Sequence, residues 1–200
     1  MTPEPVMAVH DWPSNAELIA DCARLGYLHE DWLTLDPTYG MGTFWKVFRP
    51  RSLVAHDIDP AKAPDGALDV TYMAERHAAE TFDAVVFDPP YKLNGTPTDT
   101  ARYGVHVART WAERKDLMGM GFFECVVVLK SGGYLLVKCQ NQVCSGKVRW
   151  QTDWYARWAR AAGLEKVDEL HMLSYRPQPS GRRQVHARRN HSTMLVFRKP

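Results

Sequence analysis

The chain has 200 residues, of which 45% are hydrophobic and 24% charged, so it is long enough for one globular domain with a buried core and too short for two of ordinary size. Its 25 Lys and Arg against 23 Asp and Glu give a formal net charge of +2, which excludes a uniformly basic histone-like protein and an acidic disordered tail. The four cysteines form no CxxC pair, and no segment has the pattern of a signal peptide or the ~18 apolar residues of a membrane span. We therefore expect a single cytoplasmic domain over residues 1–200, with reduced thiols and no contact with a membrane.

Short apolar runs alternate along the chain with helical stretches of mixed polarity, which predicts an α/β fold. The expected strands are Trp32–Asp36, Ser52–Asp57, Ala67–Val70, Ala84–Asp88, Tyr134–Cys139, Lys166–Leu173 and Thr193–Arg198. The expected helices are Ser14–Leu25, Thr43–Phe48, Tyr72–Ala79, Val105–Leu129 and Thr152–Ala162, with Ser14 and Thr152 as N-caps. Several strands are nearly continuous in Val, Leu and Phe, as in parallel sheets that helices cover on both faces. The last two strands are joined by a segment rich in Pro, Gly and Arg, so we expect them to pair antiparallel at one edge.

A glycine-rich turn follows the first expected strand. In LDPTYGMGTFW, the strand ends at Asp36, and Gly40 and Gly42 precede a helix that Thr43 opens. Glycines here allow a positive φ and remove the Cβ atoms between the backbone and a ligand, although an ordinary strand-to-helix turn would show the same GxG pattern. A nicotinamide-dinucleotide fingerprint would need a third glycine where Trp45 stands, which disfavours a dehydrogenase.

Acidic residues end the next two expected strands. Asp57 and Asp59 lie 17 and 19 positions after Gly40, close to the spacing at which an acid accepts hydrogen bonds from ribose hydroxyls, and Asp57 is the first choice. Asp69 lies at the end of the next strand and could accept a hydrogen bond from an exocyclic adenine amine. A solvated turn before Pro60 would also place Asp57 and Asp59 here, and Asp69 alone would also fit an ordinary turn.

The most specific motif is Asp88-Pro89-Pro90-Tyr91, directly after the apolar strand residues that end at Phe87. Two prolines fix φ and remove two donors, so this turn presents a carboxylate, a bare proline carbonyl and an aromatic face to one small volume. An exocyclic amine on a nucleobase, which has two N–H donors on a flat ring, matches that set.

With these motifs, most of the chain resembles the Rossmann-like, S-adenosyl-L-methionine-dependent amino-methyltransferases that act on adenine N6 or cytosine N4 of nucleic acids. The segment Trp12–Asn15 looks like their N-terminal cofactor motif, Asp36–Thr43 like their glycine loop, and Gly132–Lys138 like their fifth strand. The resemblance implies a seven-stranded, mostly parallel sheet with the last strand antiparallel and helices on both faces. The implied cofactor-binding residues are Trp12, Asn15, Asp36, Pro37, Tyr39, Gly40, Gly42, Thr43, Asp57, Asp59 and Asp69, and the implied catalytic residues are Asp88, Pro89, Pro90 and Tyr91.

The same resemblance favours adenine N6 in DNA, because cytosine N4 enzymes more often have Ser at the position of Asp88. An RNA base N-methyltransferase is the alternative, since some ribosomal RNA guanine N2 enzymes carry a similar tetrapeptide. A nucleic-acid-binding module that keeps the fold but has no catalytic turnover is a third hypothesis. The 200 residues leave no room for a separate target-recognition domain, so we expect loops or partners to supply any sequence specificity.

Basic residues gather at the C-terminal end, where residues 175–200 carry seven Lys and Arg and no acid, against 18 basic and 23 acidic residues upstream. This asymmetry predicts an edge that faces a polyanion, although a solvated loop would have the same composition. The resemblance implies that this polyanion is DNA more than RNA. The spacing of the histidines fits no metal site. The expected nucleic-acid contacts are Lys92, Asn94, Lys147, Arg149, Arg182, Arg183, Arg188 and Arg189. Oligomeric state is left open.

Overall fold

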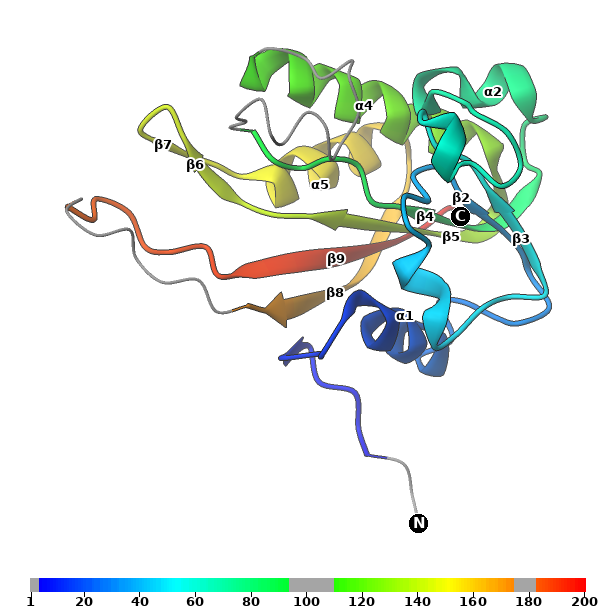
Figure 1. Ribbon diagram of the computed structural model, residues 1–200, viewed down its shortest axis with the longest axis horizontal. Helices are drawn as coiled ribbons and strands as arrows, with labels where there is room; N and C mark the ends of the chain where they lie inside the picture. The colour runs from blue at the N-terminus through cyan, green and yellow to red at the C-terminus, as the bar shows by residue number, and fades with distance from the viewer. Residues whose placement is uncertain (1–3, 94–109, 175–182) are drawn as a thin grey trace.

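A computed structural model describes residues 4–93, 110–174 and 183–200. Its main feature is a seven-stranded sheet in the order β1-β8-β9-β5-β4-β2-β3, and β6 and β7 form a separate hairpin (Figure 1). The strands are β1 (Val9–His10), β2 (Leu33–Asp36), β3 (Ser52–Ala55), β4 (Phe82–Phe87), β5 (Leu129–Cys139), β6 (Gln142–Cys144), β7 (Lys147–Arg149), β8 (Glu165–Leu173) and β9 (His191–Arg198). The α-helices are α1 (Asn15–Arg24), α2 (Met73–Arg76), α4 (Trp111–Val128) and α5 (Gln151–Ala161), and short 3-10 helices are η1 (Thr43–Lys46), η2 (Pro60–Lys62) and η3 (Val70–Tyr72).

The sheet separates two apolar cores. Helices α2, α4 and α5 cover one face, here called the α4 face, and α1 and η1 cover the other, the α1 face (Figure 1). Side chains alternate between the two along the central strands: Val85 and Phe87 of β4 pack on the α4 face, and Ala84 and Val86 pack on the α1 face. The expected Rossmann-like sheet with helices on both faces is therefore confirmed.

The only antiparallel member of this sheet within the described residues is the last strand. Strand β9 runs antiparallel to both β5 and β8, and the pairs β1–β8, β2–β3, β2–β4 and β4–β5 are parallel. The expected antiparallel pairing of the last two strands is confirmed. Parallel strands β2 and β4 lie side by side, so the motifs that follow them emerge at the same edge of the sheet.

One expected strand is wrong. Residues 67–70 make a single bridge, Asp57 to Ala67, and the chain then turns because the Asp69 side chain caps η3 by accepting hydrogen bonds from the backbone N–H and the hydroxyl of Thr71. The seventh strand is β1, which pairs Val9 with His171 at the opposite edge. Two residues are too short to produce an apolar period.

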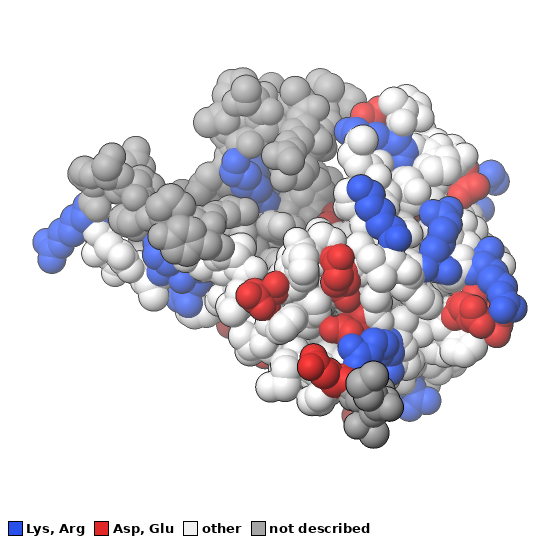
Figure 2. Space-filling model, turned by 60° about the horizontal axis from the view of Figure 1, so that its bottom comes forward, with Lys and Arg blue, Asp and Glu red and all other residues white. Residues whose placement is uncertain are grey.

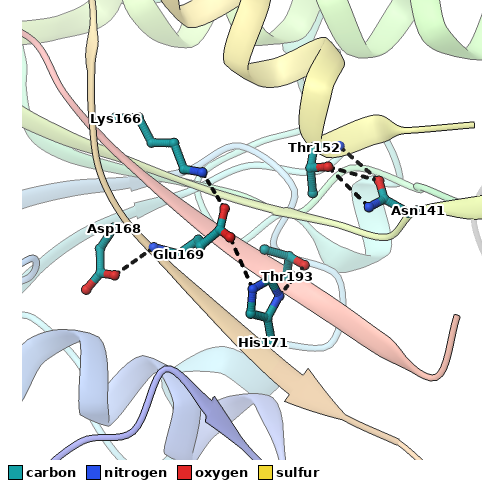
Figure 3. Close-up of polar contacts among 7 residues, drawn as sticks. All are labelled: Asn141, Thr152, Lys166, Asp168, Glu169, His171 and Thr193. Atoms are coloured by element: carbon teal, nitrogen blue, oxygen red, sulfur yellow. Dashed lines mark hydrogen bonds and ion pairs between the residues drawn. The ribbon is translucent and has the colours of Figure 1, made fainter.

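Three helical expectations also need correction. The expected helix Thr43–Phe48 is only the 3-10 turn η1, and the expected helix Tyr72–Ala79 is reduced to η3 and the four-residue α2. Ser14 caps α1 as expected, but Thr152 is not the N-cap of α5. That helix begins at Gln151, and the Thr152 backbone and hydroxyl both bond to the Asn141 amide (Figure 3). Residues 105–109 lie outside the described part, and α4 begins after the capping box of Thr110 and Glu113.

A polar network crosses the antiparallel pair β8–β9. His171 lies between Glu169, at 3.2 Å from its Nε2, and Thr193, at 3.0 Å from its Nδ1, and Lys166 binds the other Glu169 oxygen (Figure 3). These bonds give the half-buried polar side chains of this strand pair hydrogen-bond partners.

The four cysteines are buried and unpaired, as expected for reduced thiols. Within the described ranges, no helix combines the length and the apolar character that crossing a membrane requires.

Candidate active site

A cavity of about 500 Å³ opens at the carboxyl ends of β2 and β4. Most of the residues that the sequence singles out meet there, although they come from five separate segments of the chain. The expected site residues that line it are Asn15, Asp36, Pro37, Tyr39, Gly40, Thr43, Asp57, Asp59, Asp69, Asp88, Pro89, Pro90, Tyr91 and Lys92. The arrangement follows from the parallel pairing of β4, β2 and β3, whose last residues reach one edge together.

The glycine turn has the backbone conformation that its sequence predicts. Gly40 and Gly42 have φ of +56° and +63°, a region that side chains with a Cβ rarely adopt. At Gly42 a Cβ would also lie 2.5 Å from the Tyr39 hydroxyl, so the ring of Tyr39 fits over the turn only because residue 42 has no side chain. Gly42 itself does not line the cavity but shapes the wall that Tyr39 forms.

Asp36 is a buried acid whose carboxylate accepts hydrogen bonds from neighbouring groups of the same chain. One carboxylate oxygen accepts a 2.7 Å hydrogen bond from the Trp45 indole, and the other accepts the backbone N–H of Thr38 at 3.0 Å. Burial raises the pKa of Asp36 to about 7, although both hydrogen bonds lower it. The tryptophan that stands where a dinucleotide fingerprint needs glycine therefore supports the strand-to-loop turn.

Asp57 holds two loops together at the cavity wall. Its carboxylate accepts the Gly40 N–H and the Asp59 N–H, each at 2.9 Å, which joins the glycine turn to the segment after β3. Asp59 caps η2 through the N–H of Ala61 and pairs with Lys62 at 3.0 Å. Of the two acids, Asp57 is the one fixed beside the glycine turn.

The Asp88 carboxylate is the least satisfied polar group of the cavity. Its backbone N–H donates to the Thr38 hydroxyl at 2.9 Å, but its Oδ1 atom is buried and has no hydrogen-bond partner among the described residues. Burial raises the pKa of Asp88 to about 6, and the positive charge of Lys138 opposes this shift. A buried acceptor without a donor is costly in a folded protein, so Asp88 Oδ1 is the atom of this cavity wall that most lacks a hydrogen-bond donor.

The backbone after Asp88 is clamped by two glutamines and an arginine. Gln151, buried at the start of α5, donates to the Tyr91 carbonyl at 2.6 Å, and Gln142 of β6 accepts the Leu93 N–H at 3.0 Å. Arg114 of α4 donates to the Lys92 carbonyl. The proline turn is thus fixed from three sides before any ligand binds.

The remaining expected site residues that the structure describes do not line the cavity. Trp12 is buried in the core of the α1 face, where its indole donates to Asp21 at 2.8 Å. Lys147 and Arg149 lie on β7, and Arg183, Arg188 and Arg189 lie on the segment before β9. Two of these arginines stack on tryptophans: Arg149 lies 3.6 Å from the ring centre of Trp111, and Arg189 lies 4.6 Å from that of Trp150. Asn94 and Arg182 lie outside the described residues.

The β6–β7 hairpin and the ends of β8 and β9 project together from one side of the domain (Figure 1). Figure 2 shows basic side chains on this projecting part, acidic side chains near the middle of the same view, and further basic side chains on the opposite side.

Sequence reasoning missed several residues that act on the tetrapeptide or on the two residues after it: Thr38, Lys138, Gln142, Gln151 and Arg114. Thr38 could have been found, because it lies inside the glycine loop motif. The glutamines carry no such signal, since their contacts cross about 50 and 60 residues of chain.

No family model matches the chain, and no curated protein matches its sequence. Solved structures match its fold. A SAM-dependent methyltransferase from Archaeoglobus fulgidus aligns with a TM-score of 0.58 at 10% identity, over 93% of this chain and 95% of its own. The fold is that of the SAM-dependent methyltransferases. The [4+2]-cyclase SpnF aligns with a TM-score of 0.59 at 16% identity, over 92% of this chain and 80% of its own, so the shared fold does not by itself fix the reaction.

A protein assigned as a DNA modification methylase, from Thermus thermophilus and complexed with S-adenosyl-L-methionine, aligns over 66% of this chain at 16% identity. The TM-score is 0.48, and this chain spans 53% of that protein's length. This partial alignment is too weak to assign a substrate, which has to be argued from the cavity.

Proposed function

We propose that this protein transfers a methyl group from S-adenosyl-L-methionine to an exocyclic base nitrogen of nucleic acid, with adenine N6 of DNA as the first candidate. The observation that carries the proposal is the buried, unpartnered Oδ1 of Asp88 at the wall of the cavity, beside two prolines that offer no N–H. An amine that brings two N–H donors supplies what this turn lacks.

The cavity suits the cofactor in size and in charge. Its volume of about 500 Å³ lies within the range of about 300–1,000 Å³ that is usual for small-molecule sites. Five carboxylates line it against three basic side chains, which favours a ligand that carries sulfonium and ammonium charges. Asp57, fixed beside Gly40, is the proposed acceptor for the ribose hydroxyls, and Asp69 is proposed to contact the adenine amine.

When bound, S-adenosyl-L-methionine supplies an electrophilic methyl group, so the chain has to orient a nitrogen towards it. The lone pair of an exocyclic amine is delocalised into the base. Acceptors at Asp88 and at the Pro89 carbonyl would draw both N–H bonds out of the ring plane and localise that lone pair. These hydrogen bonds strengthen as positive charge develops on the nitrogen, which stabilises the transition state more than the ground state.

Tyr91 lies beside this acceptor pair and lines the same cavity. A base in a duplex reaches such a site only when it leaves the stack, and an aromatic ring then replaces part of the lost stacking. The anchoring of the Tyr91 carbonyl by Gln151 supports this role, because it fixes the backbone from which the ring projects.

The basic side chains of the projecting part are proposed to bind the phosphate backbone. Lys147 of β7 and Arg183 are exposed, and Arg183 precedes the half-buried Arg188 and Arg189 on one segment. Phosphate contacts of this kind position a substrate without reading its sequence.

Incubation with isotope-labelled S-adenosyl-L-methionine and unmethylated DNA or RNA, followed by mass spectrometry of the nucleosides, tests the proposal. We expect N6-methyladenine from DNA. Methylation of RNA alone would support the RNA alternative, and N4-methylcytosine or N2-methylguanine would identify a different target atom. Cofactor binding without any methylated product would support the hypothesis of a binding module without turnover.

The matching variant is Asp88→Ala. We expect methyl transfer to fall roughly 10² to 10³-fold through the loss of a charged acceptor at the transition state, with affinity for S-adenosylhomocysteine little changed by calorimetry. Near-normal turnover in this variant would refute the assignment of Asp88.

A further inference from the structure

Lys138 of β5 is a buried lysine that the proposed reaction does not yet use. Its residue surface is 2% exposed, and its amine donates to the Asn15 amide oxygen and lies 3.8 Å from the Met172 sulfur and 5.6 Å from the ring centre of Phe44. None of the described carboxylates lies within 4.0 Å of this amine. A charged amine in such surroundings is costly, so a purely structural role is a poor explanation for it.

The strand register places Lys138 beside Asp88. Phe87 of β4 pairs with Val137 of β5 in parallel, so the next residue of each chain is Asp88 and Lys138. Phe87 and Val137 both pack on the α4 face, and side chains alternate, so the two that follow turn towards the α1 face. The α1 face is also where Asn15 holds the lysine amine, at the wall of the cavity.

We propose that Lys138 is a positioning residue that keeps the Asp88 carboxylate ionised inside the cavity, and that Asn15 holds the lysine amine in the place where it does so. The inference rests on the proposed role of Asp88 as the acceptor for the substrate amine. Lys138 acts through charge across neighbouring strands, without touching the substrate.

Among the groups that interact with Asp88 from the surrounding elements, Lys138 carries the charge that favours the ionised carboxylate. Asp36 of β2 would repel an ionised Asp88, and Cys139 of β5 and Tyr155 of α5 interact with it as buried, neutral groups whose pKa values burial raises. Burial lowers the pKa of Lys138 and raises that of Asp88, while each charge favours the ionised form of the other. Removal of the lysine would therefore leave the Asp88 carboxylate with the burial that raises its pKa and without the charge that opposes it.

The test compares Lys138→Met, which keeps the length and loses the charge, with Lys138→Arg, which keeps the charge. Lys130→Met is the matched control, because Lys130 lies at the other end of β5, where it pairs with Asp83 at 2.7 Å. The first readout needs no substrate: the Asp88 carboxyl carbon is titrated by NMR and assigned with Asp88→Asn. The second is the single-turnover methyl-transfer rate against pH.

We expect the Asp88 titration to move to higher pH by about one unit or more in Lys138→Met, to stay near the parent in Lys138→Arg, and not to move in Lys130→Met. Methyl transfer by Lys138→Met should be at least about threefold slower at pH 6.5, as a one-unit shift from about 6 requires, and should approach the parent rate at pH 9. An unmoved Asp88 titration in a folded Lys138→Met overturns the inference. So does a tenfold loss of affinity for S-adenosylhomocysteine with no change in the titration, which would make Lys138 a cofactor ligand.

If Lys138→Met does not fold, Asn15→Leu serves instead, because it frees the amine, and the Asp88 titration should move in the same direction by less. An unmoved titration in Asn15→Leu would then overturn the inference. If no nucleic acid is methylated under any condition, the proposed function fails, and the NMR titration still decides whether Lys138 controls Asp88.

Discussion

Asp88→Asn should make the protein more stable at pH 8 while it removes activity. The pKa of Asp88 is raised from 3.8 to about 6 by burial, which corresponds to about 3 kcal/mol that the ionised carboxylate costs the folded state. An asparagine carries no charge, but its amide would be buried with unmet hydrogen bonds at a cost of about 1–2 kcal/mol. The net gain at pH 8 is therefore about 1–2 kcal/mol.

The pH dependence has a definite sign. Because the folded state holds the Asp88 proton more tightly than the unfolded chain, the cost is absent below about pH 4, grows as the pH rises to about 6, and is complete above that. The variant lacks this dependence, so its advantage at pH 8 should disappear by pH 4.5. Urea unfolding followed by circular dichroism at pH 4.5, 6 and 8 measures it, and melting temperatures should differ by about 2–8 °C at pH 8.

Asp83→Asn is the matched control, since Asp83 lies at the other end of the same strand, β4. Its carboxylate pairs with Lys130 at 2.7 Å and accepts the Leu33 N–H at 2.9 Å, and these contacts lower its pKa despite partial burial. Its contribution is present at neutral pH and lost as the pH falls, so Asp83→Asn should destabilise most at pH 8. If Asp88→Asn instead loses the same stability at every pH, the buried carboxylate is not the source of strain and the reasoning fails.

Further substitutions test other parts of the site. Asp57→Ala should weaken binding of S-adenosylhomocysteine by about 1.5–3 kcal/mol in calorimetry, and unchanged affinity would remove Asp57 from the ribose role. Gly42→Ala should cost more stability than Gly26→Ala, because both glycines have positive φ but only at Gly42 does a Cβ meet Tyr39; equal losses in thermal melts would contradict this. Gln151→Leu should slow methyl transfer at least tenfold with cofactor affinity unchanged, since it releases the Tyr91 carbonyl, and a normal rate would show that the clamp is dispensable. A variant in which Gln replaces four arginines, Arg182, Arg183, Arg188 and Arg189, should have a flatter slope of log affinity for nucleic acid against log salt concentration, by up to about 3–4 units. An unchanged slope would place the phosphate contacts elsewhere.

The parts of the fold that sequence predicts well are those with long apolar runs. Strands β4, β5 and β9 each contain a short run rich in Val, Leu and Phe, and the burial of these runs on both faces is what they indicate. The failures occur where local chemistry prevails over a short run. Asp69 caps a 3-10 turn in place of the expected strand, and β1 is formed by two residues whose pairing depends on a partner more than 160 residues away.

The site divides in the same way. The motif around Gly40 and the motif around Asp88 are each a continuous segment directly after a strand. Because β2 and β4 are parallel neighbours, both motifs reach the same cavity. The contacts of Lys138 and Gln151 join residues 123 and 60 positions apart. No spacing rule encodes such contacts, because they depend on strand register and on where α5 begins.

The short strand β1 leaves most of the outer edge of β8 uncovered. It pairs with only two of the nine residues of β8, so the backbone groups of the first part of that strand, from Glu165, face outward within the described structure. An open strand edge is a template for another chain. Here Lys166, Asp168 and Glu169 put charge on it, and a bulge at Val167 breaks its regular spacing. The edge therefore resists pairing with a second sheet, so the features that shape this end of the fold also protect it from aggregation.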